Sequence, residues 1–105
     1  MRSRALIKLL SGETGVPDDS DPWRIVWRNA QEQLHRDFGP AVVLADGTQE
    51  WWRNGQRHRE DGPAIVWPDG SQHWYRNDKL HREDGPAIVD ADGTEERWVE
   101  GKYIR

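Results

Sequence analysis

The sequence contains no cysteine and no long hydrophobic run. Without cysteine, the chain has neither disulfide bonds nor cysteine-based metal sites. The apolar stretch near the N-terminus is interrupted by Lys8 and is too short for a signal sequence or a membrane span. We therefore expect a cytoplasmic protein, located in the host cytoplasm if it is viral. Only 34% of the residues are hydrophobic and 32% are charged, which disfavours a thick, many-layered core.

An excess of positive charge is also missing. The formal net charge is −4, whereas a general nucleic-acid binder needs a basic patch. The same charge disfavours attraction to anionic lipid. We therefore expect no direct nucleic-acid binding and no membrane association. What the chain does have is seven tryptophans, each able to bury on the order of 150–250 Å². A thin fold with few, large core residues fits this composition.

The main pattern in the sequence is an internal repeat. The stretch HREDGPAIV occurs at residues 58–66 and again at 81–89, and a looser copy, HRDFGPAVV, occupies residues 35–43. The copies are 23 residues apart (58 − 35 and 81 − 58). Active sites are rarely copied in register, whereas structural units of repeat proteins are.

Turn signals inside each copy predict β-hairpins. Asp46-Gly47 lies between two β-rich runs, which is typical of a two-residue hairpin turn. Asn54-Gly55 indicates a second turn that leads to a short strand through His58. The predicted fold is mainly all-β, an elongated antiparallel β-meander of stacked repeat hairpins, with a short N-terminal helix or arm over Arg4–Leu10.

The repeat also predicts the organisation of the chain. Residues 1–22 are expected to form the N-terminal helix or arm and an acidic linker, and residues 23–105 a β-repeat domain. The stretch WRNAQEQLH from Trp27 matches WRNGQRH from Trp52 with two residues inserted. The domain therefore divides into a partial repeat, 23–33, and three repeats, 34–56, 57–79 and 80–105.

These features resemble MORN-type repeats in the variant form found in bacterial and viral proteins. The resemblance rests on the 23-residue period, the Asn-Gly and Asp-Gly pairs and the aromatic residue that follows, and it covers roughly Trp23 to Arg105. The chain departs from the usual pattern because His-Gly is replaced by His-Arg-Glu-Asp-Gly-Pro. The resemblance implies a β-hairpin array that serves as a binding scaffold, in some members for lipid or protein partners. Some bacterial members are labelled antitoxin-like.

Strand alternation predicts two different faces if the Asp-Gly loop has two residues. Val42 would then lie opposite Trp51, and the alanine of each repeat would pack against Trp52 or its equivalent to form the core. The other face would present apolar residues for a partner: Leu44, Trp51, Trp67 and Trp74. Either the N-terminal segment packs over this face through Ala5, Leu6, Leu9 and Leu10, or the face binds a partner or a second copy in a homodimer.

The third repeat is strongly acidic. Residues 80–102 contain three basic and seven acidic side chains, and 3 − 7 = −4 equals the formal charge of the whole protein. One interpretation is a terminal repeat kept polar for solubility. The other is a docking edge for a basic protein surface, with these candidate residues: Asp90, Asp92, Glu95 and Glu96. Asp90 and Glu95 are expected to lie opposite each other across the hairpin.

The repeated histidines suggest scaffold rather than chemistry. Equivalent positions two strands apart lie about 10 Å from each other, so His35, His58 and His81 cannot share one metal ion. No phosphate-binding glycine loop, nucleophile elbow or dinucleotide motif is present. We therefore expect no enzymatic activity, no metal and no cofactor.

The expected function is a non-enzymatic protein-binding module that occupies the surface of a partner. An example would be an inhibitor, such as an antitoxin or a phage protein that blocks a host defence complex. Two alternatives stay open. One is an assembly protein that self-associates through its apolar tryptophan face, and the other is a membrane-surface module.

Overall fold

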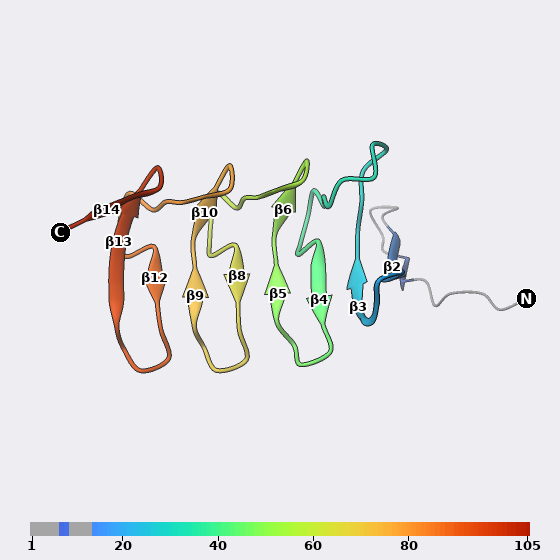
Figure 1. The fold of residues 1–105 in the computed structure, drawn as a ribbon, viewed down its shortest axis with the longest axis horizontal. Coiled ribbons are helices and arrows are strands. Elements are labelled where there is room, and N and C mark those ends of the chain that lie inside the picture. The colour runs from blue at the N-terminus through green and yellow to red at the C-terminus, as the bar shows by residue number, and fades with distance from the viewer. Residues whose placement is uncertain (1–6, 9–13) are drawn as a thin grey trace, which may run out of the picture.

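A computed structural model of the chain describes residues 7–8 and 14–105, and these residues form strands and turns without any helix. Consecutive strands pair antiparallel in a meander, and the hairpins lie side by side along the long axis of the molecule (Figure 1). The molecule measures 55 × 27 × 25 Å, so it is elongated. The predicted fold, a mainly-β antiparallel meander of stacked hairpins, is confirmed.

Ten strands of the described residues form one continuous sheet, in the order β1-β2-β3-β4-β5-β8-β9-β12-β13-β14. Each of the three repeats contributes one hairpin to this sheet: β4–β5, β8–β9 or β12–β13. The ten strands are β1 (Ile7–Lys8), β2 (Thr14–Asp18), β3 (Asp21–Val26), β4 (Val42–Leu44), β5 (Gln49–Glu50), β8 (Ile65–Val66), β9 (Gln72–His73), β12 (Ile88–Val89), β13 (Glu95–Val99) and β14 (Lys102–Ile104).

Small hairpins lie at one end of the main-sheet hairpins, where Figure 1 shows them above the strands of the main sheet. They are β6 (Trp52–Arg53) with β7 (Gln56–Arg57), β10 (Tyr75–Arg76) with β11 (Lys79–Leu80), and the outer part of β13 with β14. Asn54 and Gly55 have φ angles of 49° and 82°, the positive pair that a two-residue type I′ turn requires. The second predicted turn is therefore confirmed.

The Asp-Gly loop has three residues, not the two that the sequence suggests. The Leu44 N–H donates to the Thr48 carbonyl at 2.9 Å, which leaves Ala45, Asp46 and Gly47 in the loop. Only Gly47 has a positive φ, 98°, because Asp46 uses its carboxylate to accept the Thr48 N–H at 2.8 Å. A three-residue hairpin loop with a left-handed glycine has this form.

The longer loop shifts the register by one residue and moves side chains to the opposite face. Val42 pairs with Glu50 instead of Trp51, and Ile65 pairs with His73 instead of Trp74. We call this row the hairpin face; it contains Val42, Glu50, Ile65, His73, Ile88 and Glu96. The opposite row, here called the corner face, contains Ala41, Trp51, Ala64, Trp74 and Ala87.

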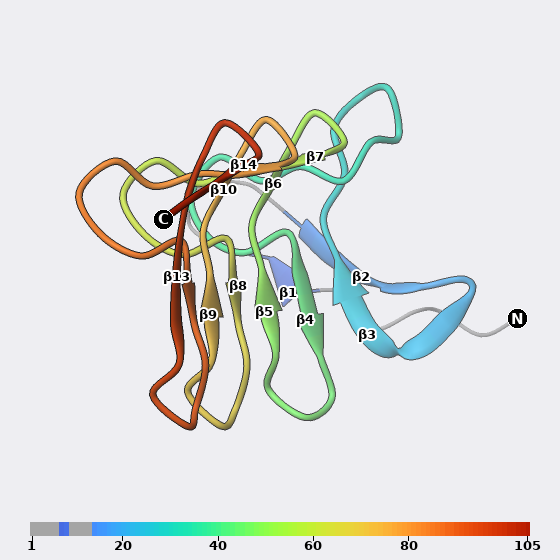
Figure 2. The ribbon, with the colours of Figure 1, turned by 60° about the vertical axis from the view of Figure 1, so that its left-hand side comes forward.

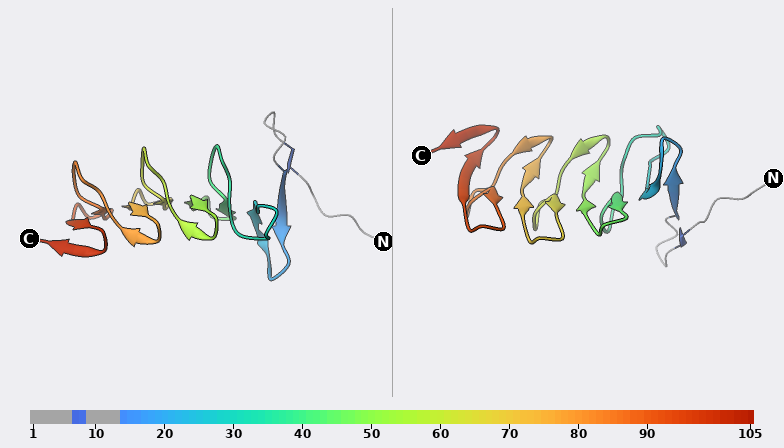
Figure 3. Two further views of the ribbon diagram at one scale, coloured as in Figure 1. Left: turned by 90° about the horizontal axis from the view of Figure 1, so that it is seen from above. Right: turned by 60° about the horizontal axis from the view of Figure 1, so that its bottom comes forward.

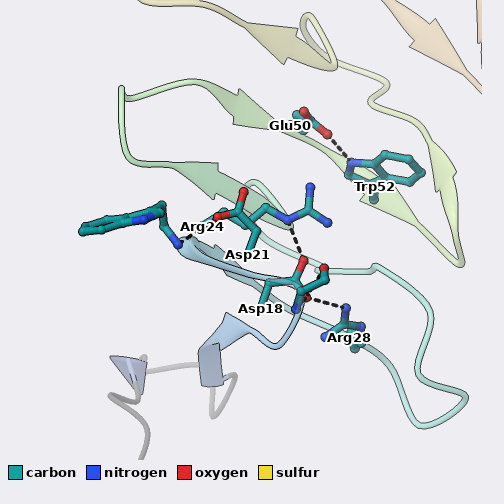
Figure 4. A network of polar contacts seen from close by, with 8 residues as sticks. Asp18, Asp21, Arg24, Arg28, Glu50 and Trp52 are labelled. Carbon is teal, nitrogen blue, oxygen red and sulfur yellow. Dashed lines mark hydrogen bonds and ion pairs between the residues drawn. The ribbon is translucent and has the colours of Figure 1, made fainter.

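The core uses small residues on one face and branched residues on the other. Ala41, Ala64 and Ala87 are fully buried, as predicted, but they neighbour Trp51 and Trp74 rather than Trp52 and its equivalents. Val42 and Ile65, which the sequence predicts on a face covered by the N-terminal segment or by a partner, are buried on the hairpin face. The adjacent Trp52 indole donates to Glu50 at 2.9 Å (Figure 4).

The segment expected to be an acidic linker lies in the sheet instead. Residues 15–22 belong to β2, the following turn and the start of β3, and β3 pairs with β4. The buried Asp18 carboxylate makes this possible, because it accepts from Arg24 at 2.6 Å and lies 3.6 Å from Arg28 (Figure 4). Two arginines, one in β3 and one in the loop after it, therefore compensate the negative charge of Asp18.

The expected N-terminal helix is contradicted at the two residues described there. Ile7–Lys8 form β1, which pairs with β2 through Ile7 opposite Gly15 and Lys8 opposite Thr14. The remaining part of Arg4–Leu10, including the residues expected to cover the apolar face, lies outside the described residues.

The repeat predicts a stabilising substitution at Glu100. This residue has a φ of 50°, in the left-handed region, where the equivalent residues are Asn54 and Asn77 with φ of 49° and 52°. Because asparagine tolerates this region better than glutamate, Glu100→Asn should raise the free energy of unfolding by about 0.5–1 kcal/mol. Urea unfolding followed by tryptophan fluorescence measures this. Glu100→Gln is the matched control, since it removes the same charge without improving the turn; an equal gain in both variants would contradict the prediction.

Asp18 should make stability depend on pH in the acid range. Burial alone would raise the pKa of Asp18, but the Arg24 guanidinium and the Ser20 N–H and hydroxyl outweigh it and hold this pKa below 3.8. The folded state therefore gains stability from Asp18 above the unfolded-state pKa and loses it as pH falls through the folded-state value. Asp18→Asn should flatten the stability curve between about pH 2 and pH 5. Urea unfolding at each pH would reveal this, and parallel curves for both proteins would refute it.

Candidate functional site

Each repeat contains a loop formed by the copied stretch that begins with His-Arg. We call residues 35–40, 58–63 and 81–86 the corner loops. The second and third corner loops each connect a small hairpin to the next strand of the main sheet. The first connects residue 34 to β4. In Figure 2 they project to one side of the sheet, and the left panel of Figure 3 shows them in a row along the long axis.

The histidine of each corner loop joins that loop to the last turn of the same repeat. His35 Nδ1 accepts the N–H of Asn54 at 3.0 Å, and His58 Nδ1 accepts that of Asn77 at 3.0 Å. His81 Nδ1 accepts the Glu100 N–H at 2.9 Å. An accepting Nδ1 carries no proton, so the neutral ring carries it on Nε2. The histidines therefore hold the left-handed turns of the following hairpins.

The arginine of each corner loop covers a tryptophan. The guanidinium carbons of Arg59 and Arg82 lie 3.9 Å from the ring centroids of Trp51 and Trp74. Arg59 Nη1 also donates to the Pro63 carbonyl at 3.0 Å. A cation over an indole ring contributes about 0.5–2 kcal/mol, so these stacks stabilise the corner face. The contacts leave Trp51 and Trp74 half-buried beneath their own loops.

The first tryptophan of this series is Trp27. Arg36 lies 4.1 Å from its ring centroid, and the Trp27 N–H donates to the Ala41 carbonyl at 2.9 Å, just as the Trp51 N–H donates to Ala64. Trp27 is thus the structural counterpart of Trp51, not of Trp52 as the sequence match suggested. With this match one residue is inserted, because His35 follows Trp27 by eight positions and His58 follows Trp51 by seven. The larger loop after Trp27 is closed by a bridge between Arg28 and Leu34.

The predicted tryptophan stripe is divided between the two faces. Trp51 and Trp74 lie on the corner face, while strand alternation places Trp67 and Leu44 on the hairpin face. Trp67 packs edge-on against His73 with 4.6 Å between ring centroids. Burial lowers the pKa of His73, against the opposing effect of the nearby Asp90 and Glu96 carboxylates. The one-residue change of register accounts for the division.

The predicted acidic residues of the third repeat are likewise distributed over both faces. Glu95 pairs with Val89, and both belong to the corner face. Asp90 lies on the hairpin face, and its carboxylate is 3.9 Å from His73 Nε2. The expected like-charge pair of Asp90 and Glu95 is therefore wrong. Asp92 accepts the Thr94 N–H in the three-residue loop, and Glu96 accepts the Trp98 indole N–H, each at 2.9 Å.

Neighbouring corner loops enclose two open grooves that sequence reasoning missed. The first groove, of about 530 Å³, lies between loops 35–40 and 58–63, with Trp51 and the exposed Phe38 in its lining. The second groove, of about 320 Å³, lies between loops 58–63 and 81–86 and includes Trp74 and His81. Carboxylates of the loops stand along both grooves. The 23-residue spacing of the loops was the signal in the sequence that could have indicated the grooves. The loops come together only because the repeats stack.

Among residues 7–8 and 14–105, no group of three or more histidine and carboxylate side chains is arranged to hold a metal ion. No helix of this part of the chain is long and apolar enough to cross a membrane.

Comparison with known proteins found no matching family model, curated protein or solved structure. The resemblance to MORN-type repeats therefore stays a prediction.

The hydrogen bond that His58 Nδ1 accepts gives a test of how the corner loop holds the last turn of its repeat. His58→Ala should lower the free energy of unfolding by about 2–3 kcal/mol, because the Asn77 N–H loses its acceptor. In His58→Asn the amide oxygen can occupy the place of Nδ1, whereas in His58→Gln it reaches toward the place of Nε2. Asparagine should therefore retain more stability than glutamine. Urea unfolding and hydrogen exchange at Asn77 measure both effects, and the reverse order would contradict this role of Nδ1.

Proposed function

We propose that this protein is a non-enzymatic protein-binding module of the MORN-type repeat class that occupies the surface of a partner. In this proposal the partner presents a basic surface to the acidic third repeat. The protein would act in the cytoplasm, and in the host cytoplasm if it is viral.

The observation that carries the proposal is the exposed charge at one end of the array. All seven carboxylates of residues 80–102 are exposed or half-buried, and none of them is fully buried. They belong to both faces, the corner loop and the turns of the third repeat: Glu83, Asp84, Asp90, Asp92, Glu95, Glu96 and Glu100. An uneven charge distribution of this kind steers a partner of opposite charge and orients it on approach.

The scaffold supports a surface-binding function in a second way. The histidine and arginine side chains of the corner loops contact turns, tryptophans and proline carbonyls of the repeat array itself. Functional groups that remain exposed are spread along an elongated surface. Such a molecule suits an inhibitor that blocks a partner surface, for example an antitoxin or a phage protein acting on a host defence complex.

One observation favours self-association as a second candidate. Within the described part of the chain strand β14 pairs with β13 alone, and its Tyr103 and Ile104 are 53% and 41% exposed. An exposed apolar edge strand can pair with another chain. Sedimentation at several protein concentrations separates a monomer from a homodimer or a larger assembly.

Affinity capture with a charge-matched pair of variants tests the binding proposal. The test variant, Asp90→Asn with Glu95→Gln and Glu96→Gln, removes three charges from the third repeat. The control variant, Glu32→Gln with Asp37→Asn and Glu50→Gln, removes three charges near the other end, and Glu50 contacts Trp52 as Glu96 contacts Trp98. Circular dichroism and urea unfolding establish that both variants fold.

We expect wild type and the control to capture the same protein from lysate, and the test variant to capture several-fold less, with a larger deficit at low salt. Equal capture by the test variant would remove the acidic third repeat as the binding surface. No protein captured by wild type above an unrelated acidic bait would contradict the binding function itself.

A further inference from the structure

The second groove contains a buried hydrogen-bond donor without an acceptor. His81 is 7% exposed, and its Nε2 atom has no hydrogen-bond partner in the described part of the chain. Because Nδ1 accepts the Glu100 N–H, Nε2 carries the ring proton. The nearest carboxylate, that of Glu83, lies 3.7 Å away, beyond hydrogen-bond distance. The buried indole N–H of Trp74, in the lining of the same groove, also lacks an acceptor.

This feature distinguishes the third corner loop from the other two. His35 Nε2 lies 2.8 Å from Asp37, and His58 Nε2 lies 3.3 Å from Glu60. Both rings therefore have an acceptor on the side opposite Nδ1. A buried polar group without a partner costs about 1–3 kcal/mol, so an acceptor supplied from outside would be bound favourably at His81.

The rims of the second groove carry exposed carboxylates. Glu60 and Asp61 stand on one loop, with side chains 62% and 92% exposed, and Glu83 and Asp84 stand on the other, with 73% and 85%. The arginines of these loops, Arg59 and Arg82, are only 26% and 24% exposed because they lie over tryptophans. The outermost charges of both loops are therefore negative, although Arg76 also contributes to the lining.

We propose that the second groove binds an extended basic segment of a partner protein. An arginine or lysine side chain of that segment lies between the two carboxylate rims, and a backbone carbonyl accepts the His81 Nε2–H. The groove volume of about 320 Å³ holds one long side chain with its peptide group. This proposal rests on the proposed function and names the chemistry of the partner.

A basic peptide can pair with the carboxylates of the rims and also accept the His81 Nε2–H, whereas a simpler ligand can do only one of the two. A free anion would accept from His81, but four carboxylates against three arginines give the groove lining a formal charge of −1, and the arginines Arg59 and Arg82 already pair with Asp61 and Asp84. A metal ion would require an unprotonated Nε2, and the hydrogen bond to Nδ1 keeps the proton there. Only a chain with a cation beside a carbonyl matches the arrangement.

The test uses the full chain and a synthetic pentapeptide, acetyl-Gly-Gly-Arg-Gly-Gly-amide, followed by NMR of backbone amides and histidine side chains. The same peptide with citrulline in place of arginine keeps the shape and removes the charge. His81→Asn is the test variant, because its amide oxygen can still accept the Glu100 N–H while the Nε2 donor is lost. His58→Asn makes the same change in the preceding loop and is the matched control.

We expect shifts at the second groove, a shift of the His81 Nε2 resonance, and no response to the citrulline peptide. Affinity should fall about ten-fold in His81→Asn and stay within about two-fold in His58→Asn. If His81→Asn does not fold, two other measurements decide. The His81 Nε2 resonance of wild type should shift when the peptide is added, and the affinity of Glu83→Gln for the peptide should fall. An unmoved Nε2 resonance, shifts confined to Asp90 and Glu95, or equal affinity in both histidine variants would each overturn the proposal.

The groove proposal and the proposed binding function can each be wrong independently, and the experiments distinguish the two cases. If wild type captures a protein partner from lysate but His81→Asn captures it equally, the groove proposal is wrong and the binding function stands. If wild type captures no protein, the binding function is wrong even when the peptide binds.

Discussion

The structure depends on one hydrogen bond that occurs three times. In each repeat a histidine Nδ1 accepts the N–H of a residue in the turn of the small hairpin at the end of that repeat, at 2.9–3.0 Å. That residue has a positive φ although it is not glycine, so the hydrogen bond holds a conformation that its side chain disfavours. This contact ties the corner loop at the start of each repeat to the small hairpin at its end, 19 residues later. Contacts between repeats are made elsewhere, by strand pairs such as β5 with β8 and by Arg59 and Arg82 stacking on Trp51 and Trp74 of the preceding repeat.

The same loops explain how a sequence with little hydrophobic content builds a core. Alanines pack beneath the sheet's tryptophans, and arginines from the corner loops cover those tryptophans at about 4 Å. Polar side chains thus cover part of the apolar surface that a second sheet covers in a β-sandwich. The consequence is that the carboxylates of the loops face outward, in rows set by the repeat. Binding chemistry on this protein is arranged along an edge, in keeping with a partner that is itself extended.

The third repeat departs from the other two in ways that coincide. Its residues 80–102 have a formal charge of −4, equal to that of the whole chain, it has Glu100 where the other turns have asparagine, and its histidine lacks an acceptor at Nε2 in the described part of the chain. Local features that oppose stability often mark functional positions, because selection retains them for another reason. This coincidence links the charge of the third repeat to the second groove, where Glu83 and Asp84 form one rim.

The sequence by itself determined the repeat, its period and the mainly-β meander, because turn pairs such as Asn54-Gly55 and alternating β-branched residues act locally. It also indicated that the histidines are structural. It did not determine the strand register, since Asp46 caps its own loop and adds one residue, which reversed the face of Trp51. It missed β2, because the charge of Asp18 is compensated by Arg24 only after folding. The grooves and the unpaired His81 Nε2 were decided by tertiary structure alone: they arise where loops 23 residues apart come side by side, and no local pattern encodes that contact.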